Sequence, residues 1–148
     1  MIYKVKKNLS DASIAHRLRK DYPNKCKNIH GHSYHFAVEF EYESLNQYDM
    51  SIDFGDIKKI CDKFIQDNWD HAMLISNDDA NLKKFLDDEK MTYFILSEDD
   101  NSTAEKMAEF LCKLWREEFS ILYNNIKTIE VMVWETDTSV ASCKIIIK

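Results

Sequence analysis

Residues 33–42 read SYHFAVEFEY, in which large apolar side chains alternate strictly with polar or small ones. The apolar positions are Tyr34, Phe36, Val38, Phe40 and Tyr42. Successive side chains of a β-strand point to opposite faces, so the stretch predicts a strand with one face on a hydrophobic core. Such a strand needs partner strands beside it and a layer of helices or a second sheet to cover it.

Weaker strand patterns lie toward both ends of the chain. Tyr3, Val5 and Ile14 suggest a first strand that ends near residue 16 and pairs with 33–42. Apolar residues recur with period two in 129–133 and again in 141–147. A polar turn near Asp137 separates the two runs, so they predict a hairpin.

The middle of the chain has helical periodicity. Apolar side chains fall three and four positions apart from Ile57 onward, which predicts an amphipathic helix to about Asn68. Ser102-Thr103-Ala104-Glu105 reads as a capping box that starts a second helix at Ser102. Residues 81–88 suggest a short extra helix and 91–96 a short strand. The order is ββααββ, an α+β fold whose four-stranded antiparallel sheet carries two helices on one face.

Composition bounds the class of protein. At 148 residues and 17.5 kDa, with two Gly and one Pro, the chain fits a single domain over residues 1–148 without a linker. A net charge of −6 disfavours nucleic-acid binding. There is no apolar run of membrane-spanning length and no signal-peptide pattern, so we expect a soluble cytoplasmic protein. Four widely spaced cysteines favour free thiols.

One segment departs from the acidic balance. Arg17, Arg19, Lys20, Lys25 and Lys27 lie between His16 and His30, with only Asp21 opposing them, a net of five minus one, or about +4. The segment is either a solvated basic loop or a local anion site.

Three histidines make the strongest chemical signal. His30-Gly31-His32 stands at the start of the strict strand, where residues two apart share a face and lie about 6.5–7 Å apart. If the first strand pairs there, His16 can supply a third imidazole. Three imidazoles with an open fourth position are typical of a catalytic zinc site. An HxH motif alone more often lies on the protein surface or in ordinary packing. The prediction of a zinc site therefore depends largely on His16.

Cys26 lies four residues before His30, between Lys25 and Lys27. Neighbouring cations favour the thiolate, which makes Cys26 a candidate base or nucleophile. Alternatively it is a fourth ligand that closes a structural zinc site. Cys61 and Cys143 fit apolar stripes of the core, and Cys112 has no assigned function.

Two further acidic positions are weaker candidates. Asp70-His71 could tune or relay a proton, although adjacent Asp-His pairs are frequent by chance. Glu135 ends an otherwise apolar strand, where a carboxylate could accept two N–H bonds from the edge of a heterocycle. A solvent-exposed charge at a strand end is an equally good interpretation of Glu135.

Taken together, the motifs resemble those of the 6-pyruvoyltetrahydropterin synthase family and its 6-carboxytetrahydropterin relatives. They are Ala15-His16-Arg17-Leu18, Cys26-x-x-x-His30-Gly31-His32-Ser33-Tyr34, Ile52-Asp53-Phe54, Trp69-Asp70-His71, Ser102-Thr103-Ala104-Glu105 and Glu135-Thr136. The resemblance covers nearly the whole chain, and residue type, order and spacing all agree. The departures are Ala12-Ser13-Ile14-Ala15, where an aromatic and two alanines are more usual, and Ser102, where proline is common.

The resemblance implies a tunnelling fold (T-fold) that assembles as a homohexamer, a dimer of trimers, with active sites between subunits. It implies that His16, His30 and His32 bind Zn²⁺ and that Cys26 is the general base. It implies a proton relay of Asp70 and His71, and a pterin ring held by Glu135 with help from Thr103.

The implied substrate is 7,8-dihydroneopterin triphosphate, and the basic segment is then expected to steer its triphosphate. Three residues separate Cys26 from the HGH motif, as in the carboxy branch, whereas the pyruvoyl branch has five. The carboxy branch releases acetaldehyde and feeds 7-deazapurine synthesis such as the queuosine route. Two alternatives are kept: pyruvoyl-type triphosphate elimination without side-chain cleavage, and a noncatalytic protein with structural zinc.

Overall fold

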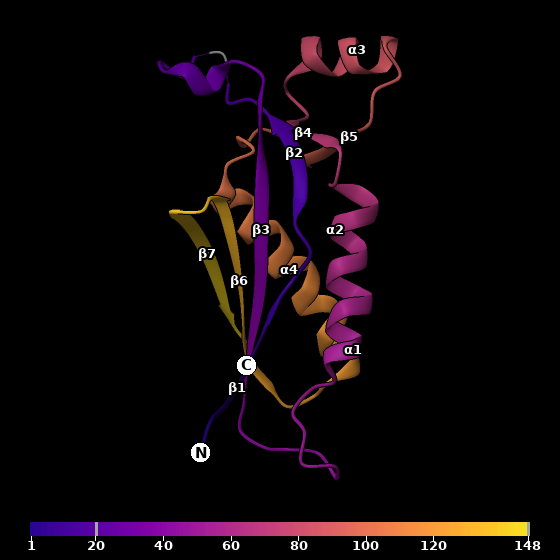
Figure 1. Cartoon of the computed structure of the whole chain (residues 1–148), viewed down its shortest axis with the longest axis vertical. Helices are drawn as coiled ribbons and strands as arrows, with labels where there is room; N and C mark the ends of the chain where they lie inside the picture. Colours follow the sequence, from indigo (N-terminus) through magenta and orange to yellow (C-terminus); the bar gives the residue numbers. More distant parts are fainter. Residues whose placement is uncertain (20, 148) are drawn as a thin grey trace.

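The computed structural model describes residues 1–19 and 21–147. Within that part of the chain the strands form one seven-stranded sheet in the order β5-β4-β2-β3-β6-β7, with β1 also paired to β3. The long strand β3 runs through its centre (Figure 1). The strands are β1 (Tyr3–Asn8), β2 (Ala12–His16), β3 (His30–Tyr42), β4 (Ala72–Ser76), β5 (Tyr93–Ser97), β6 (Ile126–Thr136) and β7 (Ser139–Ile146).

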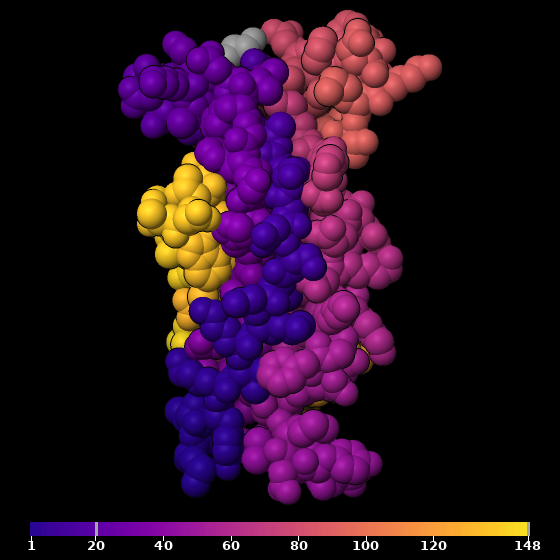
Figure 2. Space-filling model, viewed as in Figure 1, coloured from indigo at the N-terminus to yellow at the C-terminus, as the bar shows by residue number. Residues whose placement is uncertain are grey.

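The helical segments are η1 (Lys25–Lys27), α1 (Phe54–Ile57), η2 (Lys58–Asp62), α2 (Lys63–Asn68), α3 (Ala80–Asp88) and α4 (Ala104–Leu122). The segments α1, η2 and α2 follow one another without a break, and η2 is a π-helical turn. They lie with α4 on one face of the sheet (Figure 1). Figure 2 shows β1 in front, with α4 hidden behind the strands. No helix in the described ranges is both long and apolar enough to cross a membrane.

The α+β class is confirmed, but the sheet has more strands than the four expected. The expected first strand is divided into β2, which pairs with the first part of β3, and β1, which pairs with the last part. The break falls at Leu9, whose buried side chain turns into the core and whose N–H donates to the carbonyl of Phe36 (2.9 Å).

Strand β4 was missed and makes the sheet mixed, because β4 runs parallel to both β2 and β5. All five residues of β4 are buried, so it lacks the period-two pattern that identifies a half-exposed strand. The short helix expected at 81–88 is present as α3, and the short strand expected at 91–96 is present as β5.

The expected cap of α4 is shifted by one residue. Thr103, rather than Ser102, is the N-cap, and its hydroxyl accepts from the N–H of Lys106 (3.3 Å). Ser102 is only 1% exposed and turns toward the interior of the protein. The shift matters for the site described below, because it frees the Ser102 carbonyl to contact a histidine.

The core between α4 and the sheet provides a stability prediction. Phe119 is fully buried and its ring centroid lies 4.7 Å from that of Phe40 on β3. We expect Phe119→Ala to lower the free energy of unfolding by about 3–5 kcal/mol, because it removes apolar contacts and leaves a cavity. Ile121→Ala is the control in the same helix, since Ile121 is 83% exposed, and should change stability by less than about 0.5 kcal/mol. Urea denaturation measures both, and equal effects would contradict this packing.

Candidate metal centre and surrounding site

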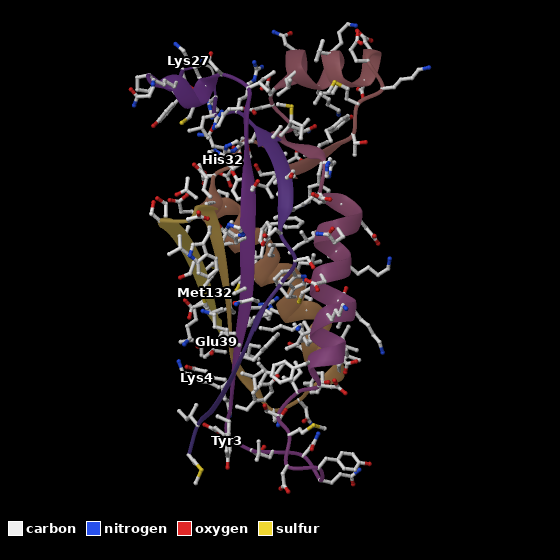
Figure 3. The ribbon with its side chains drawn as sticks, viewed as in Figure 1. Tyr3, Lys4, Lys27, His32, Glu39 and Met132 are labelled. Atoms are coloured by element: carbon white, nitrogen blue, oxygen red, sulfur yellow. The ribbon has the colours of Figure 1, made fainter. Side chains whose placement is uncertain are left out.

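Three histidines converge where β2 meets the start of β3. His16 is directly opposite His30 in the antiparallel register, and Ile14 is opposite His32. One nitrogen from each of the three imidazoles lies within 4.8 Å of the others. His32 lies toward the end of the molecule away from Tyr3, below Lys27 (Figure 3). The strand pairing therefore produces the predicted cluster.

Backbone carbonyls fix the orientation of two of the rings. Nδ1 of His16 lies 2.6 Å from the Ser102 carbonyl oxygen, and Nδ1 of His30 lies 2.7 Å from that of Asn28. A carbonyl only accepts, so each Nδ1 donates and each Nε2 keeps its lone pair. Burial lowers the pKa of His16, which favours the neutral imidazole that metals require.

The imidazole of His32 shows whether the cluster is suited to bind a metal ion. Nε2 of His32 is buried and has no hydrogen-bond partner among the described residues, although it lies 3.5 Å from a carboxylate oxygen of Glu135. Zn–N bonds of 2.0–2.1 Å place ligand nitrogens roughly 3.4 Å apart, so small side-chain rotations close the 4.8 Å set. Three neutral imidazoles suit zinc and other divalent transition metals. The residues present fit a metal ion.

Glu135 and Cys26 border this cluster. Glu135, near the end of β6, is partly buried and faces His32. Cys26 lies in η1, and its carbonyl accepts from the N–H of Leu18 (2.8 Å), which ties the thiol-bearing loop to the end of β2. The thiol contributes, after burial and Glu135, to the raised pKa of the Tyr34 phenol. Glu135 therefore lies beside His32 of its own chain, and the loop that carries Cys26 is held close to the end of β2.

The pair Asp70-His71 is held on β2 by two backbone hydrogen bonds. The N–H of Ser13 donates to Asp70 Oδ1, and the N–H of His71 donates to the Ser13 carbonyl, each at 2.8 Å. These bonds hold His71 in the left-handed region at φ 57°, which is unusual for a residue other than glycine. Nδ1 of His71 faces Asp70 Oδ2 at 2.9 Å. The Ser13 N–H and then His71 lower the pKa of Asp70.

His71 opens onto the other face of the sheet. Its side chain is 82% exposed and lines a groove of about 750 Å³. Ser13, Ala15, Gly31 and Ser33 of β2 and β3 also line this groove, and His32 forms part of its wall. Within the described residues, no hydrogen bond, ion pair or ring contact joins His71 to Cys26. The chain by itself does not bring the expected relay to the expected base.

Thr103 is close to the cluster through its neighbour Ser102, whose carbonyl holds His16. Its hydroxyl is already used as the α4 cap, as described above. The sequence contains no signal for the contacts from Ser102 and Asn28, because backbone carbonyls are common to all residues.

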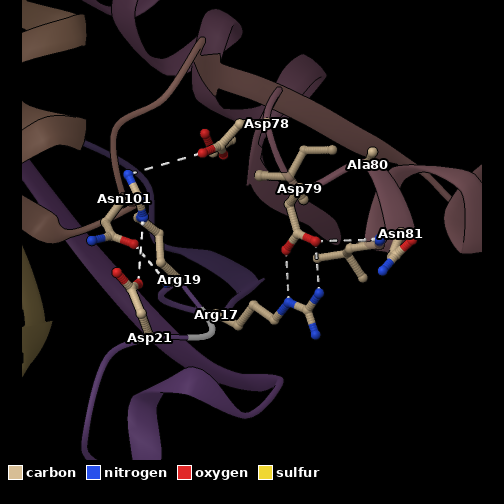
Figure 4. A pocket seen from close by; sticks show the side chains of 11 residues that line it. Arg17, Arg19, Asp21, Asp78, Asp79, Ala80, Asn81 and Asn101 are labelled. Atoms are coloured by element: carbon tan, nitrogen blue, oxygen red, sulfur yellow. Dashed lines mark hydrogen bonds and ion pairs between the residues drawn. The ribbon is translucent and has the colours of Figure 1, made fainter.

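Two of the five cations of the basic segment are paired with acidic neighbours. Arg17 donates Nε and Nη2 to the two carboxylate oxygens of Asp79, both at 2.7 Å (Figure 4). Arg19 lies 3.5 Å from Asp21 and 4.0 Å from Asp78. Lys20 lies outside the described residues. Exposed Lys25 and Lys27 have no ion pair within the described part of the chain, so they are available to bind an anion.

The fold and the cluster define an α+β protein with three converging imidazoles that could hold a metal ion, next to the carboxylate of Glu135. A family model described as 6-pyruvoyl tetrahydropterin synthase matches residues 5–145. The chain therefore belongs to the 6-pyruvoyl tetrahydropterin synthase family.

Several relatives that are similar in sequence have a name that specifies one branch of this family. The 6-carboxy-5,6,7,8-tetrahydropterin synthase of Aquifex aeolicus is 30% identical, over 94% of this chain and 88% of the relative. The protein of the same name from Haemophilus influenzae is also 30% identical, over 93% of this chain and 96% of the relative.

Solved structures confirm the tunnelling fold. The 6-pyruvoyl tetrahydropterin synthase of Plasmodium falciparum superposes with a TM-score of 0.78 at 18% identity and covers 99% of both chains. The Plasmodium vivax 6-pyruvoyltetrahydropterin synthase, in a mutant whose catalytic glutamate is replaced by cysteine, gives 0.78 at 16% identity, again over 99% of both chains. At these identities the likeness shows the fold alone.

Proposed function

We propose that the protein is a zinc-dependent 6-carboxytetrahydropterin synthase. It converts 7,8-dihydroneopterin triphosphate to 6-carboxy-5,6,7,8-tetrahydropterin, acetaldehyde and triphosphate. The observation that carries the proposal is the convergence of His16, His30 and His32 within 4.8 Å beside Glu135. The names of the 30%-identical relatives and the three-residue spacing after Cys26 support the carboxy branch. The product would supply 7-deazapurine synthesis such as the queuosine route.

His16, His30 and His32 would hold the zinc ion, which supplies Lewis-acid polarisation of the side-chain hydroxyls of the substrate when bound. Cys26, as thiolate, removes a proton from the side chain next to the ring. Asp70 holds the proton on Nδ1 of His71, so Nε2 of His71 can accept or return a proton. Glu135 anchors the ring by accepting two N–H bonds from its guanidine-like edge, and Thr103 assists there.

These steps balance without a redox cofactor. Loss of triphosphate and tautomerisation move two electrons from the side chain to the ring. Cleavage between the two side-chain carbons nearest the ring then consumes one water. It leaves a carboxylate on the ring and releases a two-carbon aldehyde.

Incubation with 7,8-dihydroneopterin triphosphate tests the shared first step. We expect triphosphate release by zinc-loaded protein and none after chelation. No turnover by a zinc-replete, fully assembled sample would overturn the proposed function. A pyruvoyl product without acetaldehyde would favour the alternative activity, triphosphate elimination without side-chain cleavage.

We also propose that the protein acts as a homohexamer. The lack of a contact between His71 and Cys26 within the described chain supports this, because His71 lines an open groove into which a second copy could bring its own Cys26. The outer strands β5 and β7 each have one unpaired edge in the described sheet, and such edges commonly pair between subunits. Native mass spectrometry should show six chains, and a catalytically active monomer would contradict the shared site.

We expect Lys25 and Lys27 to attract the triphosphate group of the proposed substrate. They flank Cys26 and are the cations of the described basic segment without an ion pair. Lys27→Glu should raise KM several-fold and leave zinc content unchanged. Lys59→Glu, the same charge change at an exposed position of η2, is the matched control. Equal KM values for the two variants would remove this role.

A further inference from the structure

Tyr34 extends the histidine cluster by one residue along the inner face of β3. It is fully buried, its ring centroid lies 5.4 Å from that of His32, and its hydroxyl oxygen lies 3.3 Å from Nε2 of His16. Because Nδ1 of His16 donates to the Ser102 carbonyl, Nε2 is an acceptor and the phenol is the donor. The contact gives this buried hydroxyl a hydrogen-bond partner, as most buried polar groups have.

A second acceptor, the Glu135 carboxylate, lies close to Tyr34, because β3 and β6 pair His35 with Trp134 and so bring the adjacent residues Tyr34 and Glu135 next to each other. After burial, the Glu135 carboxylate is the largest cause of the raised pKa of Tyr34, through both charge and a hydrogen bond. Glu135 also lies 3.5 Å from Nε2 of His32. The phenol has a single proton to donate, so His16 and Glu135 compete for it.

A metal ion changes this competition. A metal ion held by the three histidines would occupy the lone pair on Nε2 of His16 that accepts from Tyr34. Nε2 of His32, which has no hydrogen-bond partner among the described residues and lies 3.5 Å from Glu135, would then be unable to donate to that carboxylate. The phenol proton of Tyr34 would then be free to donate to the neighbouring Glu135 carboxylate, and hydrogen bonds to charged groups are stronger than those to neutral ones.

We infer that Tyr34 is a positioning residue that couples the three-histidine centre to Glu135, by turning its hydroxyl from His16 to Glu135 when a metal is bound. The fixed carboxylate is then oriented toward the pterin ring. This inference rests on the proposed function, because it takes Glu135 as the pterin anchor. Its consequence is thermodynamic: metal and pterin each raise the affinity for the other by the same factor.

The test measures the affinity for 7,8-dihydropterin by calorimetry, with zinc-loaded and with chelated protein. This pterin lacks the side chain, so it offers the metal no side-chain hydroxyl to polarise. We expect about tenfold tighter binding to the zinc-loaded wild type, the gain of roughly one hydrogen bond to a charged group. Tyr34→Phe should bind equally in both states and keep its zinc.

Tyr42→Phe is the matched control. Tyr42 lies on the same face of β3 and is fully buried, but its hydroxyl has no hydrogen-bond partner among the described residues. The Tyr42→Phe protein should keep the tenfold difference. If Tyr34→Phe keeps it as well, or if the wild type binds equally in both states, the inference is overturned while the proposed function stands. If zinc-loaded wild type does not bind the pterin at all, the proposed function fails too.

A measurement on the wild type covers the case in which Tyr34→Phe does not fold. Zinc titration should change the tyrosine ultraviolet absorbance, because Tyr34 exchanges an imidazole acceptor for a carboxylate. Among the described residues, Tyr34 is the tyrosine whose hydroxyl is hydrogen-bonded to one of the three histidines, so the change is assigned to it. An unchanged absorbance at full zinc occupancy would overturn the inference.

Discussion

Replacing Cys26 by alanine is expected to lower kcat for 7,8-dihydroneopterin triphosphate by roughly 10²–10⁴-fold, the usual contribution of a general base. The thiol lies on the η1 loop, which a hydrogen bond from Leu18 holds against the end of β2 beside the histidines. Zinc content should stay at that of the wild type, because three imidazoles hold the metal without the thiolate. Steady-state kinetics and metal analysis measure the two quantities.

Cys143→Ala is the control, since Cys143 is partly buried on β7, outside the histidine cluster, and should keep full activity. Loss of zinc from Cys26→Ala would instead identify Cys26 as a fourth ligand. The centre would then be a closed structural site, and a catalytic role for Cys26 would be wrong.

Replacing His32 by alanine is expected to abolish zinc binding and, with it, activity. The centre would keep only two imidazoles, too few for the three-ligand arrangement of catalytic zinc sites. For protein purified with excess zinc, metal analysis should give about one zinc ion per chain in the wild type and nearly none in His32→Ala.

His35→Ala is the control on the same strand. His35 points to the opposite sheet face, where its Nδ1 lies 2.7 Å from Asp11 and its Nε2 lies 3.1 Å from Asp137. The pKa of His35 is raised by hydrogen bonds to these two carboxylates, so its partners are acids and not a metal centre. Retention of zinc by His32→Ala, or its loss from His35→Ala, would contradict the assignment of the centre.

Periodicity predicted the parts of the fold in which one side of an element meets water. Strand β3 and helix α4 each have a buried and an exposed face; β3 was recognised from its spacing and α4 from the capping box at its start. Strand β4 has no exposed face, so its sequence carried no alternation to recognise. The cap of α4 was placed one residue early because Ser102 and Thr103 are both good N-caps, and only the tertiary structure shows that Ser102 is buried against His16.

The site followed the same division. The spacing of His30 and His32 alone indicated two metal ligands. His16 could be added as the third ligand once its strand was assumed to pair with theirs. The roles of Ser13, Ser102 and Asn28 could not be predicted, because they act through backbone groups. The neutralisation of Arg17 by Asp79 joins residues 62 positions apart, and the charge count of the basic segment could not reveal it.

The most direct test of the proposed reaction is the fate of the substrate side chain. Zinc-loaded protein is incubated with 7,8-dihydroneopterin triphosphate, trapped aldehyde is quantified, and the pterin product is identified by mass, with Cys26→Ala as the control. We predict one acetaldehyde and one 6-carboxytetrahydropterin per triphosphate released, with none from the variant. Triphosphate release with a three-carbon side chain retained on the pterin would contradict the assignment to the carboxy branch.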